Sequence, residues 1–299
     1  MEINSTLPAW LDENHPNFIR WKRARELSIE RGKFVYSLIS QFKECKNLKV
    51  LDLGSGEGGT SKVFSQDNFV ISFDLSLVRL QRQKENVIPK ESSTEESVFI
   101  EGERSLILSK ITQSRLVNGN ATKLPFLNSS FDLIIVQDVI EHLSETKPFL
   151  AEIKRILKPH GTVYLSTPNK LSLFNFFSDP HFGLLFISVF KRETIKKYFL
   201  KYFRKKDFNR NDIAQLLSLA KIQNLLGKAF EVELNTKFSV TELFNGNKGI
   251  VWSNFHLRLI KFIRLLRLDM LIKKMANNKI GIINKYFTPT FYLILKKKS

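Results

Sequence analysis

Short apolar runs alternate with stretches of helical spacing along residues 48–170. The runs are KVLDLG, FVISFD, RLVNGN, FDLIIVQ and GTVYLST. Strands that are buried on both faces read as continuous apolar runs, and their alternation with helices indicates βαβ units. The pattern therefore predicts an α/β protein with a doubly wound, mostly parallel sheet and helices on both faces. Between the second and third runs, KESSTEES predicts a mobile surface loop.

The flanking residues follow other patterns. Apolar side chains from Phe18 to Phe42 recur at helical spacing and predict a helical cap. After Pro168 an aromatic-rich segment is followed by a helical stretch, DIAQLLSLAKIQNLL, and a basic one, HLRLIKFIRLLRLDMLIKKM. AFEVEL and TFYLILKKK are further strand candidates, which bring the expected sheet to seven strands. We expect three parts: an N-terminal cap (1–47), a core (48–170), and a half (171–299) that completes the sheet and carries helical and aromatic insertions.

The composition indicates the cellular compartment in which the protein is expected to work. Cys45 is the only cysteine, so a disulfide within the chain and a multi-cysteine zinc site are excluded, and a reducing compartment is indicated. The polar, acidic start does not resemble a signal peptide, and no run reaches the roughly 18 apolar residues of a spanning helix. We therefore expect a cytoplasmic location.

The net charge of +18 is unevenly distributed. Residues 181–299 contain 24 Lys and Arg against 7 Asp and Glu, a net +17, whereas residues 1–180 are nearly neutral. This asymmetry indicates an anionic partner for the C-terminal half, either a membrane surface or a nucleic acid. A solvated basic face is the alternative.

A glycine-rich loop follows the first apolar run. In VLDLGSGEGG, Gly54, Gly56 and Gly59 fit the pattern G-x-G-x-x-G, which suits many anionic ligands and alone is weak evidence. Asp52 would repel a pyrophosphate but attract the ammonium group of an amino acid. Asp74 ends the next run, 20 residues past Gly54, where a carboxylate accepts hydrogen bonds from a ribose.

The series VLDLGSGEGG, SFDLS, GNATKLPFLNSSFDLIIVQDVIEHL and EIKRILKPHGTVYLSTPN resembles the class I S-adenosylmethionine-dependent methyltransferases. It is most similar to their small-molecule and glycan branch, the type 11-like methyltransferases. The resemblance implies a Rossmann-like fold, methyltransferase activity and S-adenosyl-L-methionine as cofactor. It also implies a set of cofactor-binding residues: Asp52, Gly54, Ser55, Gly56 and Gln137 at the methionine end, Asp74 at the ribose, and Leu75, Asn120 and Ala121 around the adenine.

One departure from the family concerns the adenine. The usual Gly-Asp pair is here Gly119–Asn120, so Asn120 would offer its side-chain amide to the adenine amino group as a neutral contact. Asn120 and Gln137 can alternatively serve only to satisfy backbone groups of their loops.

Transfer of a methyl group to a hydroxyl needs a base to take the proton. His142, in QDVIEHL, and His181, in SDPHFGLLF, are the candidate catalytic residues, and each can instead be structural. Asp138, Glu141 and His142 form D-x-x-E-H, which resembles the divalent-metal site of some quinone O-methyltransferases. We expect a metal-free site. His160 is expected to be structural, and His15 and His256 have no supporting context.

Two observations bear on the methyl acceptor: the motifs of two kinds of nucleic-acid methyltransferase are absent, and the C-terminal half is basic. Cys45 lies upstream of the cofactor loop, which disfavours cysteine attack on pyrimidine C5, and no N-P-P-Y-like element follows FDLIIV. Apolar and basic sides on the helix from residue 256 to residue 275 are typical of an interfacial helix, although a core-packing helix is equally compatible.

We therefore expect O-methylation of a sugar or lipid-linked glycan at the cytoplasmic membrane face, with residues 171–190 as a lid. The alternatives are a methyltransferase acting on a quinone or another prenylated small molecule, and an RNA-binding, cofactor-dependent protein. The second alternative relies on KYFLKYFRKKDFNR, where aromatic and basic side chains interleave.

Overall fold

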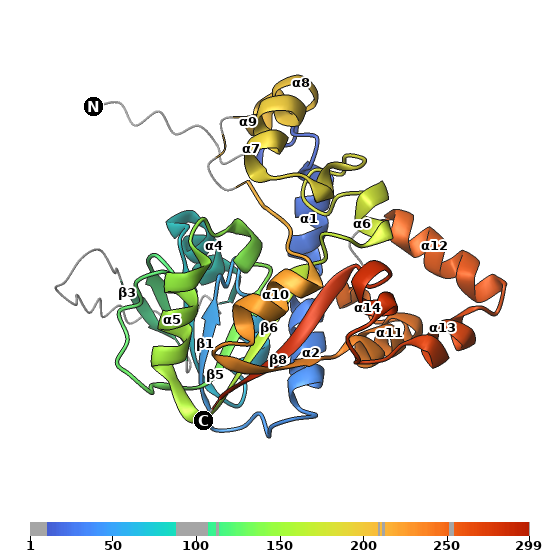
Figure 1. The fold of residues 1–299 in the computed structure, drawn as a ribbon. Helices are drawn as coiled ribbons and strands as arrows, with labels where there is room; N and C mark the ends of the chain where they lie inside the picture. The colour runs from blue at the N-terminus through green and yellow to red at the C-terminus, as the bar shows by residue number, and fades with distance from the viewer. Residues whose placement is uncertain are drawn as a thin grey trace, which may run out of the picture.

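An eight-stranded sheet forms the centre of the molecule (Figure 1). The computed structural model describes residues 11–87, 107–111, 114–208, 210, 213–250 and 254–298. The strand order is β3-β4-β2-β1-β5-β6-β8-β7. The strands are β1 (Lys49–Leu53), β2 (Phe69–Asp74), β3 (Ile107–Ile111), β4 (Ser114–Asn118), β5 (Phe131–Gln137), β6 (Leu157–Pro168), β7 (Phe230–Leu234) and β8 (Thr290–Lys297).

The sheet is parallel in its centre and antiparallel at both ends. β4, β2, β1, β5 and β6 pair in parallel, whereas β8 runs antiparallel to both β6 and β7. These seven strands coincide with the seven apolar runs, so the expected Rossmann-like sheet is confirmed. β3 adds an eighth strand, antiparallel to β4 at the edge. The loop predicted at KESSTEES lies outside the described residues.

Adjacent side chains of one strand enter different cores, which explains the continuous apolar runs. Leu133 and Ile135 of β5 face one core, and Ile134 and Val136 face the other. All four are fully buried. Burying one such side chain contributes on the order of 1.5–3 kcal/mol, so both faces stabilise the fold.

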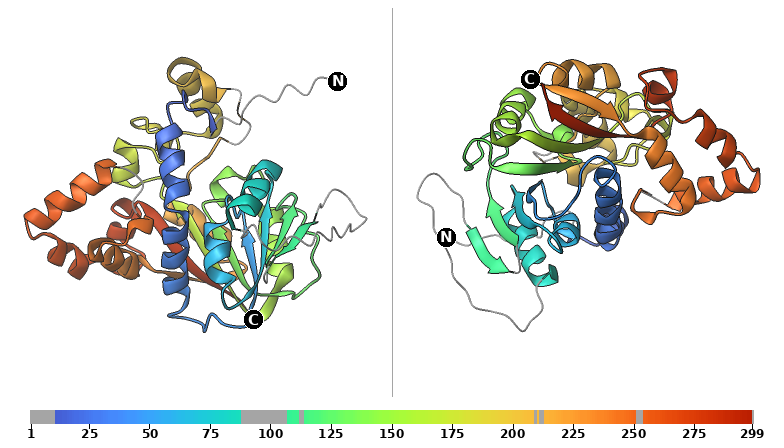
Figure 2. Two further views of the ribbon diagram at one scale, coloured as in Figure 1. Left: turned by 180° about the vertical axis from the view of Figure 1, so that it is seen from behind. Right: turned by 90° about the horizontal axis from the view of Figure 1, so that it is seen from below.

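Helices cover each face of the sheet (Figures 1 and 2). α2 (Ser28–Ile39) and α3 (Gly59–Phe64) supply the apolar side chains of one core. α5 (Thr146–Ile156) and α10 (Leu219–Leu226) supply those of the other. The expected N-terminal helical segment is present as two helices, α1 (Phe18–Glu26) and α2. α4 (Leu77–Val87) follows β2.

Short helices fill the chain between β6 and β7. They are α6 (Leu173–Phe177), η3 (Ile187–Val189), α7 (Arg192–Thr194), η4 (Ile195–Leu200), α8 (Lys201–Phe203) and α9 (Lys205–Phe208). A small core of their own, which includes Phe182, Ile195 and Leu200, holds this segment together. The helix expected over residues 212–226 begins only at Leu219, because Ser218 caps it by accepting a hydrogen bond from the Lys221 N–H.

The segment between β7 and β8 contains α11 (Thr236–Asn245), η5 (Lys248–Ile250), α12 (Asn254–Leu265), α13 (Asp269–Met275) and α14 (Ile282–Tyr286). α12 and α13 project from the body of the molecule (Figures 1 and 2). The single basic helix predicted here is two helices, since Arg267 has a φ of 56° and breaks the helical path. In the part of the chain that is described, no helix combines the length and apolar character needed to cross a bilayer.

Candidate cofactor and acceptor site

The carboxyl ends of the parallel strands meet along one edge of the sheet. β1 ends at Leu53, β2 at Asp74, β4 at Asn118 and β5 at Gln137. In open α/β sheets, ligands bind outside these ends, where the strand order reverses. The order reverses here between β1 and β5, and the glycine loop that follows β1 lies at that position.

The glycine loop has a conformation that residues with side chains rarely adopt. Gly54, Gly56 and Gly58 have φ values of 77°, 56° and 82°. A Cβ on Gly54 would lie 2.3 Å from Cγ2 of Val139, whereas a Cβ on Gly56 would meet nothing within 4 Å. Gly56 therefore faces open space, where a ligand can approach the backbone. Gly59 instead lets α3 pack closely on α2, since its Cβ would lie 2.4 Å from the Ser28 carbonyl carbon.

Asp52 lies beneath the loop and is 2% exposed. Its Oδ2 accepts a hydrogen bond of 2.6 Å from the Ser61 hydroxyl, which accepts one from the Ser72 hydroxyl. Gln83 Nε2 donates to Ser72, and Ser55 Oγ donates to Gln83 Oε1 at 3.3 Å. Burial raises the pKa of Asp52 to about 6 despite the Ser61 hydrogen bond. Asp52 thus anchors a buried polar chain, and its contact with the cofactor's ammonium group stays a prediction.

Asp74 ends β2 beside the glycine loop, and its contact with a ribose stays a prediction. Its Oδ2 accepts a hydrogen bond from the Gly56 N–H at 2.9 Å, and its Oδ1 accepts one from the Ser76 N–H at 2.8 Å. The carboxylate therefore joins the end of β2 to the glycine loop. Leu75, the next residue, is 76% exposed, so an apolar side chain stands open beside Asp74.

The residues expected around the adenine and the methionine end lie along the same edge. Asn120 Oδ1 accepts hydrogen bonds from both the N–H and the hydroxyl of Thr122, each at 2.9 Å. In this conformation Asn120 offers a donor, its amide nitrogen, rather than an acceptor for the adenine amino group. Ala121 is partly buried against the core. Gln137 Oε1 accepts a hydrogen bond from Thr60 Oγ1.

The turn after β5 separates two acidic side chains. Asp138 has a φ of 55°, and its carboxylate accepts hydrogen bonds from Arg31 at 2.5 Å and Ser166 Oγ at 3.0 Å. Glu141 is 1% exposed and its Oε2 accepts a hydrogen bond from Thr167 Oγ1 at 3.0 Å. Burial, with a smaller effect of the Asp138 charge, raises the pKa of Glu141 well above its usual range. Asp138 is therefore occupied by an ion pair with Arg31, whereas the hydrogen bond to Glu141 comes from a neutral hydroxyl.

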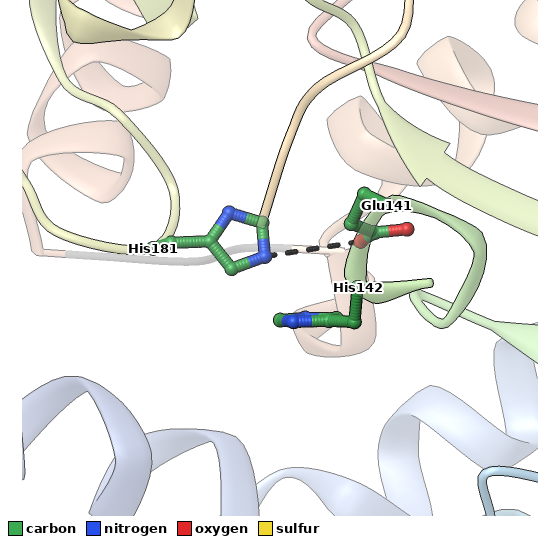
Figure 3. Close-up of side chains that lie close together, drawn as sticks. All are labelled: Glu141, His142 and His181. Atoms are coloured by element: carbon green, nitrogen blue, oxygen red, sulfur yellow. Dashed lines mark ion pairs between the residues drawn. The ribbon is translucent and has the colours of Figure 1, made fainter. Parts of the chain in front are cut away.

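The structure brings the two catalytic candidates together with Glu141 (Figure 3). The rings of His142 and His181 pack edge to face with centroids 4.9 Å apart. His181 Nε2 lies 3.8 Å from Glu141 Oε1. His142 belongs to a short 3-10 turn, η2 (Ile140–His142), and His181 comes from the insertion after α6.

Residues that the sequence analysis did not identify hold His181 in place. Asp179 Oδ1 accepts hydrogen bonds from the backbone N–H groups of His181 and Phe182. Arg20 of α1 donates to the carbonyl oxygens of Asp179 and Pro180, and Asn17 Nδ2 donates to that of His181. Asp at the start of D-P-H is a signal for such a turn. The role of α1 depends on tertiary contacts and has no local signal.

A cavity of about 130 Å³ opens beside this cluster. Trp21 and Leu27 come from the N-terminal helical segment, Pro168 from the end of β6, and Glu141 and His181 from the cluster. The lining also includes Arg20, Arg23, Arg31 and Asp138. Apolar side chains combined with a few charged groups are typical of a pocket for a small organic molecule. The cavity therefore suits the reacting part of an acceptor.

His160 and His15 do not line this cavity. His160 is exposed in the β6 segment. His15 is buried against Trp21, with Nε2 3.3 Å from Asp207 Oδ1, and burial lowers its pKa. His15 thus joins the N-terminal segment to the insertion, and the side chain of His256 lies outside the described residues.

The described residues fit an adenosyl amino acid better than a dinucleotide. Open space at Gly56, the carboxylate of Asp74 and the exposed Leu75 suit a backbone contact, a ribose and a purine in that order. The pyrophosphate of a dinucleotide would instead lie at a loop backed by the buried acid Asp52.

Comparisons with known proteins agree with this assignment. Residues 51–165 match the family model described as a methyltransferase domain. An uncharacterized protein of Methanocaldococcus jannaschii is 29% identical over 174 residues, which are 58% of this chain and 63% of that protein. A protein of Mycolicibacterium smegmatis, named as a probable S-adenosylmethionine-dependent methyltransferase, is 25% identical over 168 residues, or 56% of this chain and 51% of that protein.

A solved structure has the same fold. The S-adenosylmethionine-dependent methyltransferase of Mesorhizobium loti aligns with a TM-score of 0.50 and 14% identity, over 88% of this chain and 96% of that one. The chain spans between about half and two thirds of the two relatives compared above. The match to the family model lies in the half of the chain that forms the cofactor edge.

Proposed function

The chain belongs to the class I S-adenosylmethionine-dependent methyltransferases, and from this premise we propose that it methylates a hydroxyl group of a sugar or lipid-linked glycan. The cofactor of this family is S-adenosyl-L-methionine. Its sulfonium group is already activated, so the protein must mainly align the acceptor, exclude water and remove a proton. The activity and the acceptor are our proposal.

One observation carries the proposal for a hydroxyl acceptor. Two imidazoles and a buried carboxylate meet beside the cofactor edge, from His142, His181 and Glu141, and the last two line the cavity there. A hydroxyl has a high pKa, and its oxygen attacks a methyl group effectively only as its proton leaves. Transfer of a methyl group to a hydroxyl is therefore expected to need a cluster of side chains that accepts or displaces this proton.

The exposed surface of the C-terminal half supports a lipid-linked acceptor. Two groups of apolar side chains are exposed there, in the insertion and on α12 to α14: Leu173, Phe177, Leu185, Phe186, Phe262, Leu265, Leu266, Met270, Leu271, Met275, Ile280, Ile282 and Phe287. α6 and α12 lie side by side in Figures 1 and 2. The surrounding charge is strongly positive, which suits an anionic lipid surface. On this proposal the enzyme works at the cytoplasmic face of a membrane.

Labelled cofactor and fractionated cell extract test the proposal. The purified protein should transfer labelled methyl to the lipid-linked glycan fraction, as an ether stable to mild base. We expect His181→Asn to lower kcat at least about 100-fold, because help in removing the proton of the acceptor is usually worth this much, while binding of S-adenosylhomocysteine is unchanged. His160→Asn, at an exposed histidine, is the matched control. Label in the quinone or RNA fraction instead would replace the proposed acceptor.

A further inference from the structure

The cluster of Glu141, His142 and His181 has the geometry of a metal site. One carboxylate oxygen and one nitrogen of each ring all lie within 4.8 Å of one another. The side chains converge from the turn after β5 and from the insertion (Figure 3). Small rotations of the two imidazoles would bring three ligand atoms around one ion at bonds of about 2.0–2.2 Å.

The carboxylate of Glu141 supplies a second, independent observation. Its Oε2 accepts the Thr167 hydrogen bond, but among the described residues no group donates a hydrogen bond to Oε1. Both oxygens are buried, and a buried carboxylate oxygen without a partner is costly. Oε1 points toward His181, so a cation bound between them would remove this cost.

Asp138 is not among the ligands, and the chemistry of the three ligands indicates which metals can bind. Asp138 lies close by in sequence, but Arg31 and Ser166 already hold its carboxylate. Two imidazoles and one carboxylate suit Zn²⁺, Mn²⁺, Fe²⁺ or Co²⁺ better than Mg²⁺ or Ca²⁺, which prefer oxygen ligands. Thr167 fixes the orientation of Glu141, as the second layer of groups around a metal commonly does.

We propose that Glu141, His142 and His181 bind one divalent transition-metal ion whose open side faces the cavity. This inference rests on the proposed function, because the ion's positive charge would lower the pKa of an acceptor hydroxyl placed in the cavity. The two histidines then act as ligands, and the proton passes to solvent. A bound metal ion differs from the metal-free site that we expected from the sequence.

Metal binding is measured directly on the full-length protein after chelation and dialysis. Visible absorption on titration with Co²⁺, and calorimetry with Zn²⁺, should show one equivalent bound. We expect at least 100-fold weaker binding for Glu141→Gln and for His181→Asn. Thr167→Val should weaken binding about tenfold. His160→Asn should bind as the wild type does. Equal binding by the wild type and His181→Asn would overturn the site.

Two further readouts separate this inference from the proposed function. Melting temperatures show whether each variant is folded, and the metal-free protein should still bind S-adenosylhomocysteine. Methyl transfer that persists unchanged in the metal-free protein would contradict the ion's role in lowering the pKa of the hydroxyl and leave the proposed function intact. Such a result would favour a proton shared between Glu141 and His181. No transfer with or without Co²⁺ or Zn²⁺ would contradict the proposed function itself.

Discussion

Individual acidic side chains at the carboxyl edge have environments that differ sharply over short distances. Asp74 accepts two backbone hydrogen bonds at the end of β2, while Asp52 is buried behind the loop and accepts one from Ser61. The sequence predicts the positions of both, because each ends an apolar run. It does not predict the burial of Asp52, since the partners Ser61, Ser72 and Gln83 come from other elements.

The raised pKa of Asp52 gives a testable dependence of stability on pH. Its folded-state pKa of about 6 lies above the usual 3.8. The folded protein therefore keeps this proton between about pH 4 and 6, where the unfolded chain has released it. The stabilisation is complete below about pH 4 and is lost as the pH rises through 6, with a maximum of about 3 kcal/mol.

We expect Asp52→Asn to remove this dependence. Urea unfolding at pH 4, 5, 6 and 7 should show the free energy of unfolding of the wild type falling more steeply than that of the variant. Asp67→Asn, at an exposed aspartate, controls for the loss of one charge and should follow the wild type. Parallel curves for the wild type and Asp52→Asn would contradict the burial of the charged group.

At the scale of elements, strands were more predictable than helices. Every apolar run forms a strand, and in the central strands burial on both faces leaves an unbroken apolar pattern. The prediction of a helix over residues 212–226 was partly wrong: residues 213–216 form no helix, and Leu217 pairs with Asn169 in an isolated bridge. The prediction of one long basic helix was also wrong, because the helix is interrupted at Arg267. Both differences concern where a helix begins or is interrupted, and the spacing of apolar residues does not predict these positions.

The projecting helices α12 and α13 test the membrane proposal. Leu265 and Met270 are 79% and 68% exposed. In a flotation assay the wild type should bind vesicles that contain anionic phosphatidylserine or phosphatidylglycerol. Leu265→Glu together with Met270→Glu should lower binding at least about tenfold, because two apolar contacts are lost and two like charges face the lipid.

Leu127→Glu is the matched control for these variants. Leu127 is likewise highly exposed, but it lies between β4 and β5 in the cofactor half. We expect this variant to float as the wild type does. If neither the wild type nor the variants bind the vesicles, the membrane face is not the site of action, and the exposed apolar surface has another partner.

The whole molecule consists of two halves that share one sheet and differ in charge. Nearly all of the net positive charge lies in residues 181–299, while the matched domain ends at residue 165. β7 and β8 join the second half to the sheet, and contacts from α1 hold the insertion that carries His181. The four motifs predicted the cofactor edge, because its residues follow strands in order. The meeting of His181 with Glu141 and His142 needs contacts between distant segments, which the sequence alone does not give.

We assign the binding of S-adenosyl-L-methionine to the glycine loop and Asp74. Titration calorimetry with S-adenosylhomocysteine tests it most directly, with NAD as the competing dinucleotide. We expect one equivalent of S-adenosylhomocysteine to bind, about 10- to 100-fold more weakly to Asp74→Ala because a charged acceptor is lost, and NAD not to bind. Binding of NAD in place of S-adenosylhomocysteine would contradict the claim.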